Sequence, residues 1–309
     1  MASDEKGISR RDLLVNGTRA GACIGMAAAL SSCKMLQSDS PAGRKPKMRF
    51  GLTTYQWAKE WDVETLLDYC EKAAVYGVEL RTSLSYAHGV ELNLDAQQRR
   101  EVKRRFADSP VTLVGLATSE RFDSPDQDKL KTAIENAKAY MKLNHDVGGS
   151  GVRVFPNAFQ KGVDRQQTIR QIAVSLNIVG SYAADYGQQV RLEAHGNAGE
   201  LSTIKAIMDL VTSPSVRVKL NSDKRDTKGQ GLRYNFNLVK DRLGSTIHVH
   251  DFSDPGFPYQ KLVDLLAEAN WSGWALLERS DKVRNPVEAL SEQRQIWDDM
   301  VKSSLRRKA

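Results

Sequence analysis

The chain has 309 residues, a formal net charge of +7, and 40% hydrophobic against 27% charged residues. This composition is ordinary for a globular protein with a sizeable core. The basic residues are spread along the sequence apart from short clusters such as Arg306, Arg307 and Lys308, and no basic stripe alternates with aromatic residues. We therefore expect no nucleic-acid partner.

Residues 1–33 have the features of an export signal. Paired Arg10 and Arg11 precede a small-residue apolar stretch from Ala20 to Leu30, which resembles a twin-arginine signal and is too short to span a bilayer permanently. The segment LSSC ending at Cys33 resembles a lipoprotein cleavage site, so Cys33 would be acylated and would tether the protein to a membrane. We expect an exported, periplasmic lipoprotein; the alternative is a disordered N-terminal tail.

Residues 34–47 are polar and rich in Ser, Pro, Gly and Lys, which indicates a flexible tether before a domain over residues 48–309. Of the three cysteines, only Cys70 falls in this domain, so no disulfide can form inside it. Cys70 lies in a helical pattern and is expected to be a small buried apolar side chain.

From Met48 onward, a strand followed by a helix recurs eight times. Asp62 and Asp164 are expected helix N-caps, the second for a helix over 165–186, and Gly77, Gly187 and Gly244 are expected to close helices. The expected strands, each short, apolar and β-branched, cover residues 49–53, 77–81, 111–116, 151–155, 188–193, 216–220, 246–250 and 273–278.

Regular alternation of this kind predicts a parallel sheet with right-handed crossovers. Eight units in one domain favour a single (β/α)8 TIM barrel over an open doubly wound sheet. An open sheet usually has a glycine-rich turn after its first strand, whereas residues 53–57 here read TTYQW. In a barrel the loops that follow the strands share one face, and active sites lie there.

Polar residues end strands five to eight of this predicted barrel. Glu193 ends strand five, Asn221 ends strand six, His248 lies near the end of strand seven and Glu278 ends strand eight. Two carboxylates, one imidazole and one amide carbonyl could together hold a divalent cation. Such mixed oxygen and nitrogen ligation without a thiolate suits Mn²⁺, Mg²⁺, Co²⁺ or Zn²⁺.

The succession of LEAHG, HVHD and LLE on these strands resembles the xylose isomerase-like barrel family over residues 48–300. That family includes sugar-phosphate isomerases and epimerases and the endonuclease-four type. The resemblance implies the metal ligands Glu193, Asn221, His248 and Glu278. It also implies that the two glutamates exchange the substrate proton as catalytic residues, and that His195 assists them.

One departure from the family pattern bears on the metal. Asn221 stands where the family places aspartate, which lowers the negative charge of the site by one, and Asp223 would substitute only if its loop turned inward. The alternative is a metal-free mouth in which Arg153 and Arg81 pair with the two glutamates.

Further side chains near strand ends are candidates for contacts with the substrate. An arginine can bind a carboxylate or phosphate, and an aromatic ring can stack on a sugar. We expect His250, which shares a strand with His248, to face the other way in a structural role. The expected substrate-binding residues are Arg81, His88, Arg153, Trp57, Asp223 and Asp251.

The sequence therefore predicts a carbohydrate isomerase or epimerase that uses metal-assisted proton transfer next to a carbonyl. Because few sugar phosphates occur outside the cytoplasm, a small free sugar or keto-sugar is the expected partner. The alternatives are a keto-sugar lyase or hydratase of the same fold and a metal-free sugar-binding protein. Five histidines are too few for the metal cluster of an endonuclease-four-type phosphodiesterase. The metal, the substrate and the oligomeric state stay open.

Overall fold

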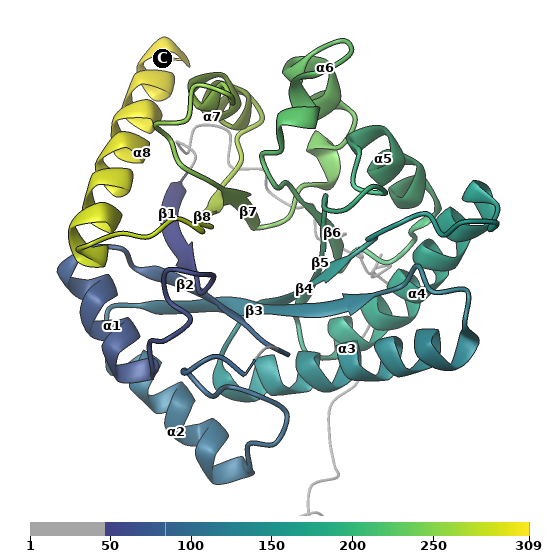
Figure 1. Ribbon diagram of the computed structural model, residues 1–309, viewed down its shortest axis with the longest axis horizontal. Coiled ribbons are helices and arrows are strands. Elements are labelled where there is room, and N and C mark those ends of the chain that lie inside the picture. Colours follow the sequence, from purple (N-terminus) through teal and green to yellow (C-terminus); the bar gives the residue numbers. More distant parts are fainter. Residues whose placement is uncertain (1–46, 84, 309) are drawn as a thin grey trace, which may run out of the picture. The chain divides into compact units, whose positions relative to one another are not determined.

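The computed structural model describes residues 47–83 and 85–308. Within them, eight parallel strands alternate with helices in a nearly closed barrel (Figure 1), which confirms the predicted (β/α)8 fold. None of the helices in this described part is long and apolar enough to cross a membrane. The predicted signal, Cys33 and nearly all of the predicted tether lie outside the described residues.

The strands follow the predicted ranges closely, and neighbouring strands pair in parallel in the order β6-β5-β4-β3-β2-β1-β8-β7. Among the described residues, β6 and the segment of β7 are joined by an isolated bridge between Val218 and Leu243 and by two backbone hydrogen bonds, from Gly244 to Val218 and from His248 to Leu220 (both 2.8 Å). The strands are β1 (Met48–Thr53), β2 (Gly77–Arg81), β3 (Thr112–Arg121), β4 (Gly151–Phe155), β5 (Gln189–Glu193), β6 (Val216–Lys219), β7 (Thr246–Val249) and β8 (Gly273–Leu277).

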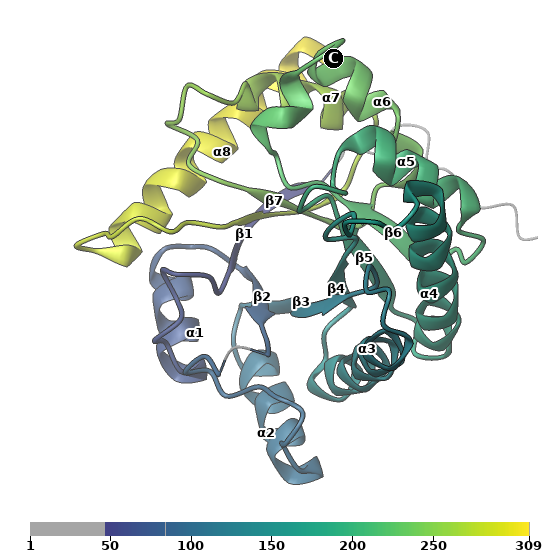
Figure 2. The same cartoon turned by 45° about the vertical axis from the view of Figure 1, so that its right-hand side comes forward.

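The helices surround the strands, as Figures 1 and 2 show. Two predicted N-caps are confirmed: the Asp62 carboxylate accepts from the amide of Thr65, and that of Asp164 accepts from Gln167, both at 2.8 Å. The helices are α1 (Val63–Lys72), α2 (Ala96–Ala107), α3 (Gln127–Val147), α4 (Arg165–Asp185), α5 (Leu201–Leu210), α6 (Leu232–Asn237), α7 (Tyr259–Glu268) and α8 (Pro286–Lys308), with the short 3₁₀ helices η1 (Lys224–Thr227) and η2 (Lys240–Arg242).

The predicted helix-closing glycines are right at one position and wrong at two. Gly187 follows α4 with φ +63°, the left-handed conformation that favours glycine. After α1 the left-handed residue is Ala74 (φ +55°), whereas Gly77 already belongs to β2. A Cβ at Gly77 would clash with the indole of Trp274, so this glycine serves close packing, and Gly244 likewise has no positive φ.

Strand β3 is longer than predicted and runs five residues beyond 116, to Arg121. This extension secures an arginine of the neighbouring strand. The Thr118 hydroxyl donates to the Arg153 carbonyl (2.8 Å), and Arg153 Nη1 donates back to the Thr118 carbonyl (2.5 Å). The additional residues of β3 therefore hold Arg153 at the mouth of the barrel.

The interior of the barrel contains charged side chains as well as apolar ones, whereas such interiors are usually filled by branched apolar side chains. Arg191 lies fully buried and donates to the hydroxyl of Ser150 (2.8 Å). A Cβ at Gly115 would clash with the Gly151 carbonyl and lie 2.5 Å from an Arg191 Nη1 atom. Gly115 and Gly151 thus make room for the long side chain of Arg191.

Gly115→Ala is therefore expected to destabilise the barrel by about 1–3 kcal/mol, because the added methyl meets backbone that cannot move aside. Urea denaturation measures this change. The matched control is Gly256→Ala, where the added Cβ meets mainly the flexible end of Lys224. Equal stability of the two variants would contradict the close packing.

Cys70 is fully buried in α1, as predicted, and it is free. Burial raises the pKa of its thiol to about 12. The thiol is therefore protonated at neutral pH and serves as a packing group.

Candidate active site

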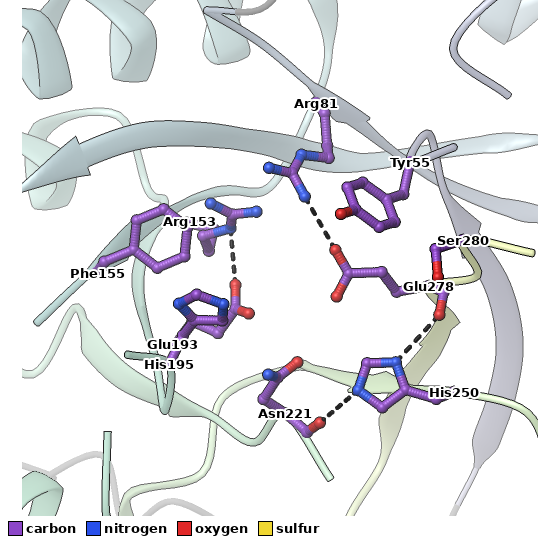
Figure 3. A pocket seen from close by; sticks show the side chains of 10 residues that line it. All are labelled: Tyr55, Arg81, Arg153, Phe155, Glu193, His195, Asn221, His250, Glu278 and Ser280. Carbon is purple, nitrogen blue, oxygen red and sulfur yellow. Dashed lines mark hydrogen bonds and ion pairs between the residues drawn. The ribbon is translucent and has the colours of Figure 1, made fainter. Parts of the chain in front are cut away.

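A pocket of about 390 Å³ opens where the strands end (Figure 3). It lies at the face where barrel enzymes place their catalytic residues. Its walls come from residues at or just after the ends of six strands and from the first loop: Tyr55, Arg81, Arg153, Phe155, Glu193, His195, Asn221, His250, Glu278 and Ser280.

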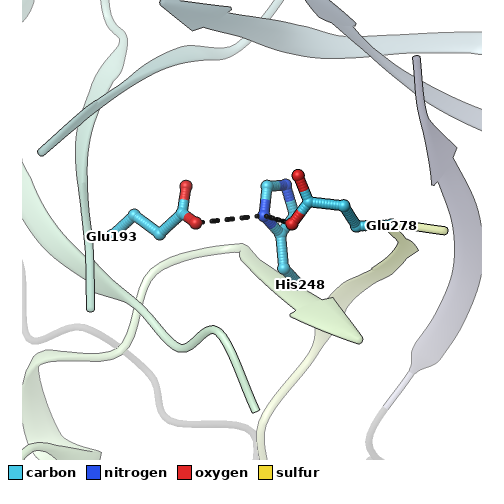
Figure 4. Close-up of side chains that lie close together, drawn as sticks. All are labelled: Glu193, His248 and Glu278. Atoms are coloured by element: carbon cyan, nitrogen blue, oxygen red, sulfur yellow. Dashed lines mark ion pairs between the residues drawn. The ribbon is translucent and has the colours of Figure 1, made fainter. Parts of the chain in front are cut away.

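Three predicted ligands converge beneath this pocket, although they lie far apart in the sequence. Glu193 ends β5, His248 lies in β7 and Glu278 directly follows β8. His248 Nδ1 is 3.4 Å from Glu193 Oε1 and 3.4 Å from Glu278 Oε2 (Figure 4). One ligand atom from each residue lies within 4.8 Å of the others, a spacing that a single cation can bridge.

The side chains around this set fit a bound metal ion. His248 Nε2 lies 2.8 Å from Glu79 Oε2, a carboxylate acceptor that holds a proton on Nε2. Burial and Lys219 oppose protonation of the ring, but the two glutamates raise the pKa of His248 to about 10, so a metal ion would have to displace the proton on Nδ1. A carboxylate behind a ligating histidine is a common arrangement in metal sites. Nδ1 is buried without an aligned hydrogen-bond partner among the described residues, and the same holds for Asn221 Oδ1. Three predicted ligands therefore direct donor atoms at one place, and Asn221, with its unpaired Oδ1, lines the same pocket.

Beneath His248 lies a fully buried ion pair that the sequence did not reveal. Lys219 Nζ is 2.6 Å from Glu79 Oε2. Burial alone would raise the pKa of Glu79, but the charge of Lys219 and the hydrogen bond to His248 hold it well below its usual range. Burial lowers the pKa of Lys219 to about 8. Glu79 therefore stays ionised and fixes the orientation of His248.

Both glutamates also pair with arginines, as the metal-free alternative predicted. Arg81 Nη1 lies 2.9 Å from Glu278 Oε1, and Arg153 Nε lies 2.7 Å from Glu193 Oε2. These pairs use one oxygen of each carboxylate and leave the other directed at His248. Burial opposes ionisation, yet the charge of His248 lowers the pKa of Glu278 to about 2, and Arg153 holds that of Glu193 well below its usual range.

The expectation that His250 faces away from His248 is wrong. Residues two apart in a strand point to the same face, and His250 accordingly lines the pocket. Its ring nitrogens lie 3.0 Å from the backbone carbonyls of Asn221 and Glu278. His250 thus braces the ends of β6 and β8 against each other.

His195, predicted to assist catalysis, lies in the wall of the pocket with its ring 5.0 Å from that of Phe155. Within the described residues its side chain makes no hydrogen bond, so its nitrogens are free to contact a bound molecule. Phe155 and Ser280 were missed by sequence reasoning. Like the residues it did find, they end or shortly follow strands.

His88 does not line the pocket, which corrects its predicted role. Its Nε2 donates to the Arg81 carbonyl (2.8 Å), and its Nδ1 accepts from the Val90 amide (3.0 Å). Both nitrogens are used by backbone, and the ring is only 6% exposed. His88 therefore shapes the loop after β2.

Burial lowers the pKa of His88 from 6.5 to about 4. Because the fold favours the neutral ring, this stability is fully present above pH 6.5 and is lost as the pH falls from 6.5 towards 4. The stability difference between wild type and His88→Gln, measured by urea denaturation, should therefore shrink over that range. A difference that stays constant with pH would contradict a buried neutral His88.

Three other predicted substrate contacts lie outside the pocket wall. Trp57 is buried and donates its indole N–H to a backbone carbonyl (2.8 Å). Asp223 pairs with Arg225 and caps η1, and Asp251 pairs with Arg279 at 2.9 Å. Each side chain has a partner that holds it in a loop, so the predicted substrate contacts are corrected to structural roles. Asp223 accordingly does not replace Asn221 as a ligand.

No curated protein sequence matches this chain. Among solved structures, L-ribulose 3-epimerase is similar with a TM-score of 0.72 and 13% identity, over 84% of this chain and 97% of that one. The 3-keto-D-glucoside 4-epimerase YcjR from E. coli gives 0.68 and 15%, over 81% and 98%. The IOLI protein with a bound zinc atom gives 0.69 and 15%, over 84% and 99%. At these identities the similarity shows the fold.

The family of xylose isomerase-like TIM barrels matches residues 67–300, most of the barrel and all four candidate ligands. This match agrees with the resemblance seen in the strand-end motifs. The chain belongs to the xylose isomerase-like TIM barrel family.

Proposed function

We propose that the protein is a carbohydrate isomerase or epimerase that moves a proton on the carbon next to a carbonyl group. The observation that carries this proposal is the convergence of Glu193 and Glu278 on either side of His248 Nδ1, at the floor of one pocket. Family membership and structural neighbours that are themselves sugar epimerases support it.

The two glutamates would share the proton transfer. Both are ionised at neutral pH, so one can take the proton from the substrate carbon while the C–H electron pair moves towards the carbonyl and its oxygen becomes negative. The other glutamate, after taking up a proton from solvent, would return it to the opposite face and so invert the centre, while the first glutamate releases its proton to solvent. Return of the proton to the former carbonyl carbon, with a proton moving from the neighbouring hydroxyl to the former carbonyl oxygen, would give an isomer instead.

Glu193, His248, Glu278 and the Asn221 carbonyl would hold a divalent cation, Mn²⁺, Mg²⁺, Co²⁺ or Zn²⁺. Such an ion would polarise the carbonyl and stabilise negative charge on its oxygen. The pocket volume lies in the range of small-molecule sites, and Tyr55 and Phe155 offer rings for the apolar face of a keto-sugar.

Solvent-exchange measurement tests the proposal. Keto-sugars incubated with the protein in D₂O and Mn²⁺ should gain deuterium next to the carbonyl, as followed by NMR. Metal analysis of the purified protein should find about one divalent ion per chain. A protein that binds sugars without exchange and without metal would be a binding protein, and loss of water from the sugar would indicate a hydratase or lyase.

We also propose that the protein is exported through the twin-arginine pathway and anchored at Cys33. The paired Arg10 and Arg11 and the LSSC segment support this. Cell fractionation should find the protein in the membrane fraction, and Cys33→Ser should release it into the periplasm. Retention of Arg10→Lys, Arg11→Lys protein in the cytoplasm would support the pathway, and unchanged export would refute it.

A further inference from the structure

At the floor of the pocket, three carboxylates are each paired with a cationic side chain. Glu79 pairs with Lys219 at 2.6 Å. Above them, Glu193 pairs with Arg153 at 2.7 Å and Glu278 with Arg81 at 2.9 Å. Three carboxylates against three cations sum to a net charge of zero, once His248 has given up its proton so that Nδ1 can bind a cation.

A divalent cation on this set therefore brings a surplus of two positive charges. Asn221, which lines the same pocket, is neutral and offsets none of it. Arg191, deeper in the barrel and fully buried, adds a further positive charge. Since charges buried away from water are costly unless they are matched, the loaded pocket favours a ligand that is itself negative.

The two arginines have donors left for such a ligand. Arg81 uses Nη1 on Glu278, and Arg153 uses Nε on Glu193 and Nη1 on the Thr118 carbonyl. Within residues 47–83 and 85–308 the Nη2 group of neither arginine makes a hydrogen bond, and Arg81 Nε is buried without a partner. Both side chains line the pocket and lie over aromatic rings, Arg81 on Tyr55 and Arg153 on Phe155.

We infer that the substrate is a sugar acid whose carboxylate is bound by Arg81 and Arg153. A guanidinium presents parallel donors that match a carboxylate. Because these arginines touch the same two glutamates that would move the proton, the carboxylate lies close to the reacting carbon. This inference rests on the proposed function for the position of that carbon, while the binding of acids can be measured independently of any reaction.

The test is calorimetric titration of the full chain loaded with Mn²⁺. The probes are D-gluconate, D-galactonate and D-glucuronate, each compared with its amide, which has nearly the same shape and no charge. At least one acid should bind about 10- to 100-fold more tightly than its amide, the range expected for charge-assisted hydrogen bonds. By reciprocity, that acid should tighten Mn²⁺ binding by the same factor by which Mn²⁺ tightens acid binding.

Arg81→Gln should remove most of the preference for the acid over its amide. Arg81 is chosen because Arg153 is almost fully buried and its loss would disturb the fold. The matched control is Arg279→Gln, an arginine near the mouth that is paired with Asp251 and Asp281 and does not line the pocket. Circular dichroism verifies that both variants are folded.

The inference is overturned if acids and amides bind alike, if no acid binds, or if Arg279→Gln removes the preference as fully as Arg81→Gln. Deuterium exchange into neutral keto-sugars without acid binding would overturn it while the proposed function stands. Acid preference without exchange into any sugar or sugar acid would support the binding site and refute the proposed function.

Discussion

Lys219→Met is expected to lower the free energy of unfolding by about 3–5 kcal/mol, because it leaves the fully buried Glu79 carboxylate without its cation. Methionine has a similar length, so little volume is lost. Urea denaturation of metal-free protein measures the effect. The pair joins β2 to β6 across the barrel. Its loss also disturbs Glu79, which holds His248 through Nε2.

The double variant Glu79→Gln, Lys219→Met should recover much of that loss, since no unpaired charge then remains. Lys205→Met, which breaks an exposed pair with Asp209, is the matched control and should change stability little. Glu79→Gln alone should weaken Mn²⁺ binding about 10- to 100-fold by loosening the orientation of His248. If Lys219→Met were as stable as Lys205→Met, the expected contribution of the buried Glu79–Lys219 pair to the free energy of unfolding would be contradicted.

Glu278→Gln is expected to reduce solvent-deuterium exchange into the substrate by about 10²–10⁴-fold, because an amide cannot accept the proton that a carboxylate accepts. Glu278 suits this test better than Glu193, since its side chain is 11% exposed and its loss leaves no fully buried arginine unpaired. The measurement is the NMR exchange rate at saturating Mn²⁺, which separates loss of proton transfer from weaker metal binding.

Asp251→Asn is the control, because this carboxylate lies near the mouth without lining the pocket. It should keep an exchange rate close to that of the unchanged protein. An exchange rate in Glu278→Gln within a few-fold of the unchanged protein would show that Glu278 is not an acid or base in the reaction, and the proposed mechanism would fail.

The fold could be predicted from the sequence because each strand is recognisable from its own residues, as a short apolar run bounded by helix signals. Parallel strands of a barrel bring their last residues to one face. The positions of the strand ends therefore predicted that Glu193, His248 and Glu278 lie together. Arg81 and Arg153 were found for the same reason. For these residues, lying near the end of a strand was enough to predict that they lie at the pocket.

The remaining misjudgements have two physical causes. Loop residues such as His88 and Trp57 follow no period, so their final partners depend on how the loop folds back over the barrel. Glu79 and Lys219 are 140 residues apart, and only the register around the whole barrel brings them together. The error at His250 was avoidable, because the two-residue repeat of a strand places it with His248.

Few backbone hydrogen bonds join β6 to β7, so the barrel is more easily deformed at this junction. Asn221 follows one side of it and His248 lies on the other, whereas the strands that carry Glu193 and Glu278 are firmly paired to their neighbours β4 and β1. Thermal motion would therefore separate β6 from β7 more readily than β6 from β5 or β7 from β8. In the proposed metal site, this freedom would allow ions of different radius to bind, and amide protons of β6 and β7 that face this junction should exchange with solvent sooner than those of β1 and β8.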